Sequence, residues 1–242
     1  MRAAMILVTA LGACSMSADA ERGPEAGDGR TGQRAFEVGR FDTISLGGSY
    51  DVSVNVGGAT SVRAQGDPEL LDRLEVDVVR GDLRIRTKRG NWSWNSVRGR
   101  APVRIHVTTP ALAGASIGGS GDMRIDKVDG SGFTGSIGGS GNMEIASLRT
   151  GKADFSIAGS GDIKATGSAG RSTISIAGSG NADLAQLEVR TANISVVGSG
   201  NVRARATDVA DVSILGSGDV TMSGPARCKV SKLGSGDVRC GA

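Results

Sequence analysis

The residues of this chain best suited to chemistry are carboxylates and amides that follow a repeated Gly-Ser-Gly. The first clear copy runs from Gly119 to Asp122, and six more begin at Gly139, Gly159, Gly178, Gly198, Gly216 and Gly234. Each copy ends in Asp or Asn: Asp122, Asn142, Asp162, Asn181, Asn201, Asp219 and Asp237. Glycine-rich loops can hold phosphate, and rows of side-chain oxygens can hold calcium, so both kinds of site have to be considered.

The motif argues against a phosphate site and disfavours calcium, which stays the less favoured alternative. A phosphate-binding loop needs a lysine and the start of a helix after its glycines, and the Gly-Ser-Gly segments have neither. Calcium needs roughly six to eight oxygen ligands, whereas each copy contributes one carboxylate or amide. Calcium-binding nonapeptide repeats also recur about every nine residues, with a different glycine spacing. We therefore expect no metal and no cofactor at these loops.

The spacing of the copies is more informative than their chemistry. Successive copies start 18 to 20 residues apart, and self-similarity at such a period is the signature of a stacked repeat. Counted from the first glycine, apolar residues recur two positions before, four after and six after, and these even offsets share one face of a strand. The pattern predicts an all-β fold, a parallel β-helix built as a single-stranded solenoid with about 18 to 20 residues per coil and a right-handed coil favoured.

The glycines and the final Asp or Asn of the motif each have a structural role in such a stack. Glycine supplies positive φ angles and lets neighbouring coils approach closely. The Asp or Asn that follows can hydrogen-bond the backbone of its own turn. Stacked carboxylates repel one another, and the mixture of Asp with Asn dilutes that charge.

The segment before the repeats also reads as β-structure. Residues alternate between apolar and polar from Phe41, and Leu46 to Asp51 (LGGSYD) resembles a degenerate early copy of the motif. Asp67 and Pro68 suggest the N-cap and first residue of a short helical turn. His106, the single histidine, lies on a predicted strand and is interpreted as structural. Further strands are expected at Glu75–Val79, Asp82–Thr87 and Val103–Thr108.

Both tryptophans lie in a loop between the last two of these strands. Trp92 and Trp94 are two residues apart, so an extended segment would place them on one face, and Arg89 and Arg98 flank them. One interpretation is a contact surface for a ligand or glycan, with rings that stack on sugars. The other is a hydrophobic lid over the core, and it is favoured because tryptophan more often buries its ring.

The N-terminus has the features of a secretory signal. Arg2 precedes an apolar run from Ala3 to Ala13, which is too short to span a membrane, and the sequence LGAC ending at Cys14 resembles a bacterial lipobox. We predict a lipoprotein signal peptide at 1–13, lipidation of Cys14, a flexible tether at 14–35 and a β-helical domain at 36–242. The alternative is an ordinary signal peptide that is removed together with Cys14. Ser15, which stands where an inner-membrane lipoprotein of some Gram-negative bacteria has Asp, favours the outer membrane.

Two further cysteines lie near the C-terminus. A location outside the cytoplasm would favour a disulfide between Cys228 and Cys240, spanning the interior of the last coil and closing the end of the solenoid. Two free buried thiols are the alternative. A zinc site is disfavoured because the pair has no matching histidines.

Charge argues against a nucleic-acid partner. The formal net charge is +3, from 28 Lys and Arg against 25 Asp and Glu. Nucleic-acid binding would need the basic residues gathered on one surface.

The order of these segments resembles a known bacterial family. FDTISLGGSYDVSVNVG (Phe41–Gly57), PELLDRLEVDVVRGDLRIRT (Pro68–Thr87), VRIHVTTPALAGASIGGSGD (Val103–Asp122) and the serial GSGD or GSGN copies are similar to the family described as putative auto-transporter adhesin, head GIN domain. The resemblance covers about Phe36 to Ala242. It implies a secreted or lipid-anchored envelope protein with a β-helical fold, and it supplies no catalytic or ligand residues.

Together these features favour a non-enzymatic, lipid-anchored protein of the cell envelope with a role in adhesion or envelope structure. Its partners would be the membrane, through the lipid, and an envelope protein or a glycan. The alternative is a glycan-binding module that uses Trp92 and Trp94. A polysaccharide-active enzyme is less favoured, because the sequence offers no Ser, His, Asp order and no histidine pair for a metal.

Overall fold

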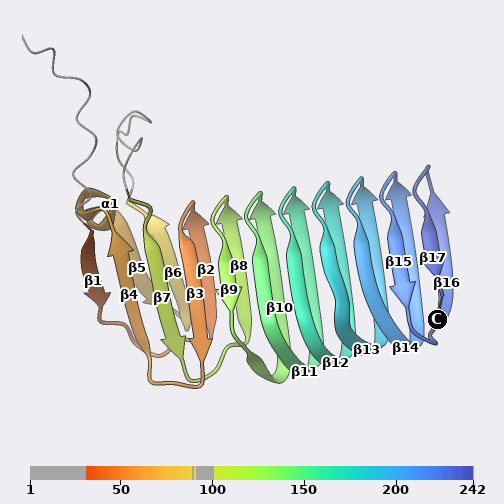
Figure 1. Ribbon diagram of the computed structural model, residues 1–242, viewed down its shortest axis with the longest axis horizontal. Helices are drawn as coiled ribbons and strands as arrows, with labels where there is room; N and C mark the ends of the chain where they lie inside the picture. The colour runs from red at the N-terminus through yellow and green to blue at the C-terminus, as the bar shows by residue number, and fades with distance from the viewer. Residues whose placement is uncertain (1–30, 89, 91–100, 242) are drawn as a thin grey trace, which may run out of the picture.

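The protein forms one elongated stack of β-coils (Figure 1). The computed structural model describes residues 31–88, 90 and 101–241. These residues build a β-solenoid of about six turns, in which strands of successive coils pair side by side in parallel. The predicted all-β solenoid is therefore confirmed.

The regular part of the stack consists of long strands, with shorter strands before and after them. They are β10 (Val128–Gly139), β11 (Met143–Gly159), β12 (Ile163–Gly178), β13 (Ala182–Gly198) and β14 (Val202–Gly216), followed by β15 (Val220–Ser223), β16 (Arg227–Leu233) and β17 (Val238–Cys240). Of these, β11 to β14 each run from one Gly-Ser-Gly turn to the next. Equivalent repeat positions lie opposite each other, as Ile137 does to Ile157 and Gly139 to Gly159. Aligned motifs in the sequence are therefore aligned rows in space.

The N-terminal part of the stack does not follow chain order. It contains β1 (Gly32–Phe36), β2 (Thr43–Gly48), β3 (Asp51–Val56), β4 (Ser61–Gly66), α1 (Pro68–Asp72), β5 (Leu74–Val79), β6 (Asp82–Thr87), β7 (Arg104–Thr109), β8 (Gly114–Gly119) and β9 (Met123–Ile125). The coil formed by β2 and β3 lies between β6 and β7 on one side and β8 and β9 on the other. Gly48 pairs with Gly119, which confirms the LGGSYD segment as an early copy of the motif.

Antiparallel strands close the N-terminal end. β5 pairs antiparallel with β6, and β4 pairs antiparallel with both β7 and β1. α1 begins as predicted: the Asp67 side chain accepts hydrogen bonds from the backbone N–H groups of Glu69 and Leu70, and Pro68 occupies the first turn. Leu71 of this helix is buried.

β1 overlaps the segment 14–35 that the sequence assigned to the tether, and its last residue, Phe36, is the first of the predicted domain. Its residues are mostly exposed, so apolar alternation could not reveal it. Backbone pairing with β4 holds the strand, and the Arg34 side chain donates to the Leu71 carbonyl and lies over the Phe36 ring. Within the part of the chain that the structure describes, the first strand therefore begins at Gly32, upstream of the expected boundary at residue 36.

Rows of aliphatic side chains fill the interior. The residues two positions before each motif, from Ile117 to Ile214, and those four positions after its first glycine, from Met123 to Val220, are no more than 2% exposed. Large and small residues also alternate between coils. Phe133 pairs with Ala153, and Gly135 pairs with Phe155, so the two phenyl rings pack with centroids 6.3 Å apart.

The two glycines of the motif have different roles. The first has a positive φ in every copy, for example 148° at Gly139. The second, such as Gly141, has no such φ, but a Cβ there would overlap the carbonyl oxygen of Gly121 in the preceding coil. The first glycine thus makes the turn, and the second lets the coils stack.

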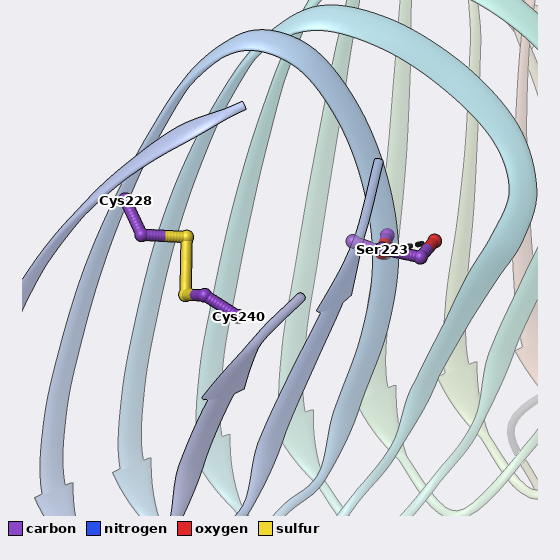
Figure 2. Close-up of a disulfide and its surroundings, with 4 residues drawn as sticks. Ser223, Cys228 and Cys240 are labelled. Atoms are coloured by element: carbon purple, nitrogen blue, oxygen red, sulfur yellow. Dashed lines mark hydrogen bonds between the residues drawn. A yellow bond between two sulfur atoms is a disulfide. The ribbon is translucent and has the colours of Figure 1, made fainter. Parts of the chain in front are cut away.

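A disulfide closes the C-terminal end. Cys228 of β16 and Cys240 of β17 are bonded, with Cα atoms 6.5 Å apart, and Figure 2 shows the bond linking the two strands. Cys228 is paired with buried Ala210 and Cys240 with buried Met222, so the bond lies over the end of the core. The predicted disulfide is confirmed. Lys232 occupies the position that is aliphatic in earlier coils, and it is exposed because no further coil covers it among the described residues.

Candidate functional site

The Asp and Asn residues of the motifs form a hydrogen-bonded row along the outside of the solenoid, here called the Asp/Asn ladder. In each step, the Oδ1 atom of one residue accepts a hydrogen bond from the backbone N–H of its counterpart in the next coil, as Asp122 does from Asn142 at 3.0 Å. The predicted bond to the residue's own turn is wrong, because stacking brings the N–H of the neighbouring coil within reach. Members of the ladder are Asp122, Asn142, Asp162, Asn181, Asn201, Asp219 and Asp237.

The Asn residues of the ladder add a second hydrogen bond. Asn142 Nδ2 also donates to Asp122 Oδ1 at 2.9 Å, and Asn201 Nδ2 donates to Asn181 Oδ1 at 3.0 Å. An amide between two carboxylates therefore replaces a repulsive contact with an attractive one. Asp219 and Asp237 are adjacent with no Asn between them.

A second row, two residues further along each coil, carries charges of both signs. This charged column consists of Arg124, Glu144, Lys164, Asp183, Arg203, Thr221 and Arg239. In its N-terminal half the charges neutralise one another: Arg124 Nε lies 2.9 Å from Glu144 Oε2, and Lys164 Nζ lies 3.8 Å from Glu144 Oε1. Among the described residues, Arg203 and Arg239 in the C-terminal half form no ion pair.

The ladder and the charged column are the walls of a polar trough that follows the solenoid axis. Two adjoining cavities of about 620 and 700 Å³ share Asp162 and Lys164, so they are parts of one groove. The groove extends from Asp51 and Arg104 to Arg239. The residues between the walls, such as Ile163 and Val202, point into the core and are buried.

Ion pairing in the trough favours the charged form of one carboxylate, Glu144. The hydrogen bond from Arg124 is the main cause that lowers the pKa of Glu144 below its ordinary value of 4.5. Outside the trough, on the antiparallel strands β5 and β6, Arg86 lowers the pKa of Glu75 in the same way, and Glu75 in turn raises the pKa of Arg86. A general acid or base needs a pKa moved toward neutrality, whereas these shifts move away from it.

A different face, formed by the strand segments before the motifs, carries a row of serines. It contains Ser45, Ser116, Ser136, Ser156, Ser175, Ser195, Ser213 and Ser231, which are paired in register. A shallow groove of about 420 Å³ runs beside its C-terminal half, from Thr173 to Ser231.

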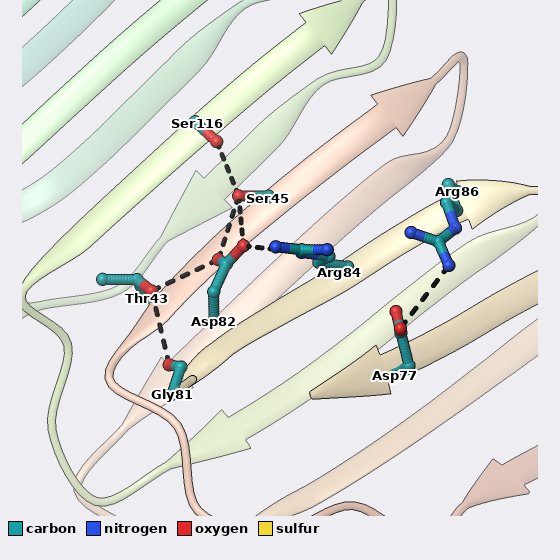
Figure 3. A network of polar contacts seen from close by, with 8 residues as sticks. All are labelled: Thr43, Ser45, Asp77, Gly81, Asp82, Arg84, Arg86 and Ser116. Carbon is teal, nitrogen blue, oxygen red and sulfur yellow. Dashed lines mark hydrogen bonds and ion pairs between the residues drawn. The ribbon is translucent and has the colours of Figure 1, made fainter. Parts of the chain in front are cut away.

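The N-terminal end of this face is a polar network (Figure 3). Ser45 Oγ donates to Asp82 with 2.9 Å to each carboxylate oxygen, and Ser116 Oγ donates to Ser45 Oγ at 2.9 Å. Arg84 also contacts Asp82, at 3.4 Å. These groups bind one another, so this end is stabilised internally rather than open to a ligand.

The C-terminal end of the same face also carries exposed apolar side chains beside the serines. The position just before the motif is Gly or Ala in the early coils, but it is Val197, Leu215 and Leu233 in the last three, where the side chains are 50%, 50% and 70% exposed. We call these three residues the apolar stripe. With Val230, they are the exposed large hydrophobic residues of the part of the chain that the structure describes. Clustered exposed apolar side chains mark contact surfaces, whereas scattered ones need no explanation.

Several predicted site residues lie outside the described residues, namely Cys14, Arg89, Trp92, Trp94 and Arg98. His106 is exposed on β7. No group of three or more His, Cys, Asp or Glu side chains within residues 31–88, 90 and 101–241 is placed to hold a metal ion. In those ranges, no helix is both long and apolar enough to cross a membrane.

The trough and the stripe were not predicted from the sequence. Both could have been found by reading the outward columns of the repeat, since the charged column and the stripe keep fixed offsets from the glycines. They are inconspicuous along the chain because their residue types vary from coil to coil, unlike the glycines and the inward aliphatic residues.

These features define a class, a repetitive β-solenoid whose chemical groups are displayed in rows along its faces. The model for the family described as putative auto-transporter adhesin, head GIN domain, matches residues 40–226, and the chain belongs to this family. A comparison with curated proteins found no match.

Solved structures share the fold over most of the chain. A putative adhesin from Bacteroides fragilis is 24% identical, with a TM-score of 0.80, and the match covers 87% of this chain and 97% of that one. A putative lipid binding protein from Parabacteroides distasonis is 26% identical, with a TM-score of 0.71 and coverage of 89% and 98%. A putative adhesin from Parabacteroides merdae is 18% identical, with a TM-score of 0.68 and coverage of 89% and 98%.

Proposed function

We propose that this protein is a non-enzymatic component of the cell envelope, anchored by lipid at Cys14, that presents a contact surface at the far end of its solenoid. The observation that carries the proposal is the apolar stripe. Val197, Leu215 and Leu233 lie in the last three coils, whereas the chain enters the stack at the other end, at β1 (Figure 1). A tether at the N-terminus would leave the stripe free to meet another macromolecule.

Among the described residues, no clear pKa shift moves a group toward neutrality, as a general acid or base needs. Within the described residues, the clear shifts belong to exposed ion pairs and hold those groups in their ordinary charged forms. The family description and the adhesin names of the structural relatives agree with adhesion. The name of the Parabacteroides distasonis relative adds a lipid surface as a second contact to test at the stripe.

Two measurements test this proposal. The first replaces Cys14 with Ala, which should move the protein from the membrane fraction to the soluble fraction. The second measures binding of the purified domain to intact cells and, separately, to lipid vesicles, after Val197→Ser, Leu215→Ser and Leu233→Ser are combined.

The matched control for the second measurement is Ala158→Ser with Ala177→Ser, which changes the same column in earlier coils. We expect the stripe variant to lose at least about tenfold in cell binding and the control to keep it, because only the stripe variant removes large exposed apolar side chains. Equal binding by the wild type and both variants would refute the stripe as the contact surface. Loss of vesicle binding alone would identify a lipid contact.

A glycan-binding module that uses Trp92 and Trp94 is the second candidate. Its support is the placement of two aromatic rings two residues apart in an arginine-rich loop. A glycan array that compares the wild type with Trp92→Ala and Trp94→Ala combined tests it, and unchanged binding counts against the loop.

A further inference from the structure

The C-terminal half of the polar trough holds hydrogen-bonding groups that the protein itself does not use. Arg203 and Arg239 form no ion pair within the described residues. Asp219 uses one carboxylate oxygen to accept the Asp237 N–H at 2.8 Å, and its Oδ2 atom and both oxygens of Asp237 accept no hydrogen bond from the described residues. The N-terminal half differs, because Glu144 there is shared by Arg124 and Lys164.

The charges in this half are mixed and nearly balanced. Four carboxylates face three cationic side chains, and two amides and one hydroxyl separate them. These lining residues are Asp162, Lys164, Asn181, Asp183, Asn201, Arg203, Asp219, Thr221, Asp237 and Arg239. A polyanion would meet carboxylates along its whole length, and a polycation would meet guanidinium groups. Neither kind of charged polymer would therefore lie against side chains of uniformly opposite charge.

The floor of the trough excludes apolar ligands. Ile163, Ala182, Val202 and Val220 point inward and are no more than 2% exposed. A ligand in the trough therefore meets polar side chains and backbone. Hydroxyl groups suit such walls, because each hydroxyl can both donate to a carboxylate and accept from an amide or guanidinium.

The repeat sets the orientation of the ligand. Adjacent coils are about 4.8 Å apart, and each coil presents one ladder residue and one residue of the charged column. Sugar rings of an extended 1,4-linked glycan follow one another at a similar spacing, so such a chain can meet equivalent groups ring after ring. We propose that the C-terminal half of the polar trough binds an uncharged, linear polysaccharide that lies parallel to the solenoid axis.

Titration calorimetry with defined hexasaccharides tests the proposal. The uncharged probes are cellohexaose, mannohexaose, xylohexaose and N-acetylchitohexaose, and the charged probes are hexagalacturonate and chitosan hexamer. We expect at least one uncharged probe to bind with little dependence on salt, because no net charge is neutralised. Failure of all four uncharged probes overturns the proposal, as does stronger, salt-dependent binding of a charged probe.

Variants locate the site. Arg203→Ala combined with Asp219→Asn should weaken binding at least about tenfold, the equivalent of one lost hydrogen bond to a charged group. The amide introduced by Asp219→Asn keeps an oxygen for the Asp237 N–H, so the ladder and the fold are retained. Arg124→Ala is the matched control, because this residue lies in the other half of the same column and is already paired with Glu144.

Two further comparisons separate this site from the others. The stripe variant should keep glycan binding, since the stripe lies on a different face and the trough proposal does not depend on it. Binding that Trp92→Ala and Trp94→Ala abolish, but that the trough variant leaves unchanged, assigns the glycan to the loop and overturns the proposal. Hydrogen exchange of the wild type with the bound glycan should show new protection between residues 162 and 239.

Discussion

Asp162 Oδ1 accepts two hydrogen bonds from Asn181, one from the backbone N–H at 3.0 Å and one from Nδ2 at 2.8 Å. The same oxygen therefore links two coils at two points. An Asp-to-Asn step of this kind joins coils without placing two carboxylates together, which explains why the motif ends in either residue.

The first prediction concerns this step. Asp162→Ala removes the acceptor and should lower the free energy of unfolding by about 1–2 kcal/mol, because both donors of Asn181 lose their protein partner. Asp162→Asn keeps an oxygen at the same place and should change it by less than about 0.5 kcal/mol. Urea denaturation of both variants checks this, and equal losses would show that charge rather than the hydrogen bonds stabilises the step.

The second prediction concerns two glycines of one coil. Gly141→Ala should cost about 3 kcal/mol, the upper part of the usual range for overpacking, because the new Cβ overlaps the carbonyl oxygen of Gly121 and the backbones must separate. Gly138→Ala should be neutral or stabilise by about 0.4–1 kcal/mol. A Cβ at Gly138 comes no closer than 3.8 Å to the Ile117 carbonyl oxygen, and Ala already stands at the equivalent position, Ala158. Thermal melts of Gly141→Ala and Gly138→Ala test this prediction, and similar Tm values for the two variants would contradict the stacking role of the second glycine.

The third prediction concerns a hydroxyl in the core. Ser172 is 1% exposed, its Oγ atom has no hydrogen-bond partner among the described residues, and its neighbours in the row are Ala153 and Ala192. Ser172→Ala should therefore stabilise the protein by about 1 kcal/mol, because an unpaired buried hydroxyl is removed with little change in volume. Ser175→Ala on the exposed serine row is the control and should stay within about 0.5 kcal/mol of the wild type. A lower Tm for Ser172→Ala would mean that the hydroxyl has a partner.

The fourth prediction concerns pH. The pKa of Glu144 is lowered in the folded protein, mainly by the hydrogen bond from Arg124, so its ionised form stabilises the fold. This contribution is present above the ordinary pKa of 4.5 and is lost as pH falls through the lowered folded value. The Tm difference between the wild type and Glu144→Gln should thus be constant near neutral pH and disappear in acid. A difference that grew on acidification would have the wrong sign.

The inward-facing half of the fold could be predicted from the sequence because glycines and aliphatic residues recur at fixed offsets. Gly119 and Ile117 have counterparts in every coil of the regular stack up to β14, and that recurrence implies parallel pairing in register. The arrangement of the strands at the N-terminal end was harder to predict from the sequence. Most strands from Thr43 to Thr109 were recognisable, although β4 (Ser61–Gly66) was not predicted. The spatial order of these strands depends on which strands pair, and alternation within a strand carries no information about its neighbour.

The outward surfaces were predicted least well. The direction of the Asp122 hydrogen bond depends on the stacked coil rather than on the local sequence, and a local turn rule therefore chose the wrong partner. The Asp/Asn row of the trough is visible in the sequence, but the row two residues further on is not, because its residue types change from coil to coil, as from Glu144 to Lys164. Cys228 and Cys240 were predictable because a covalent pair leaves few alternatives.

The two ends of the stack have a consequence for how this molecule could change over generations. The antiparallel strands around β5 and the disulfide at Cys228 close the stack by different means, and neither pairs with the coils between Gly139 and Gly198. Duplication or deletion of one unit of about 20 residues inside the gene would therefore lengthen or shorten the protein by about 4.8 Å while every remaining coil keeps an equivalent neighbour. The number of repeat copies therefore sets the length of the solenoid, and selection can change that number while the contacts between coils stay the same.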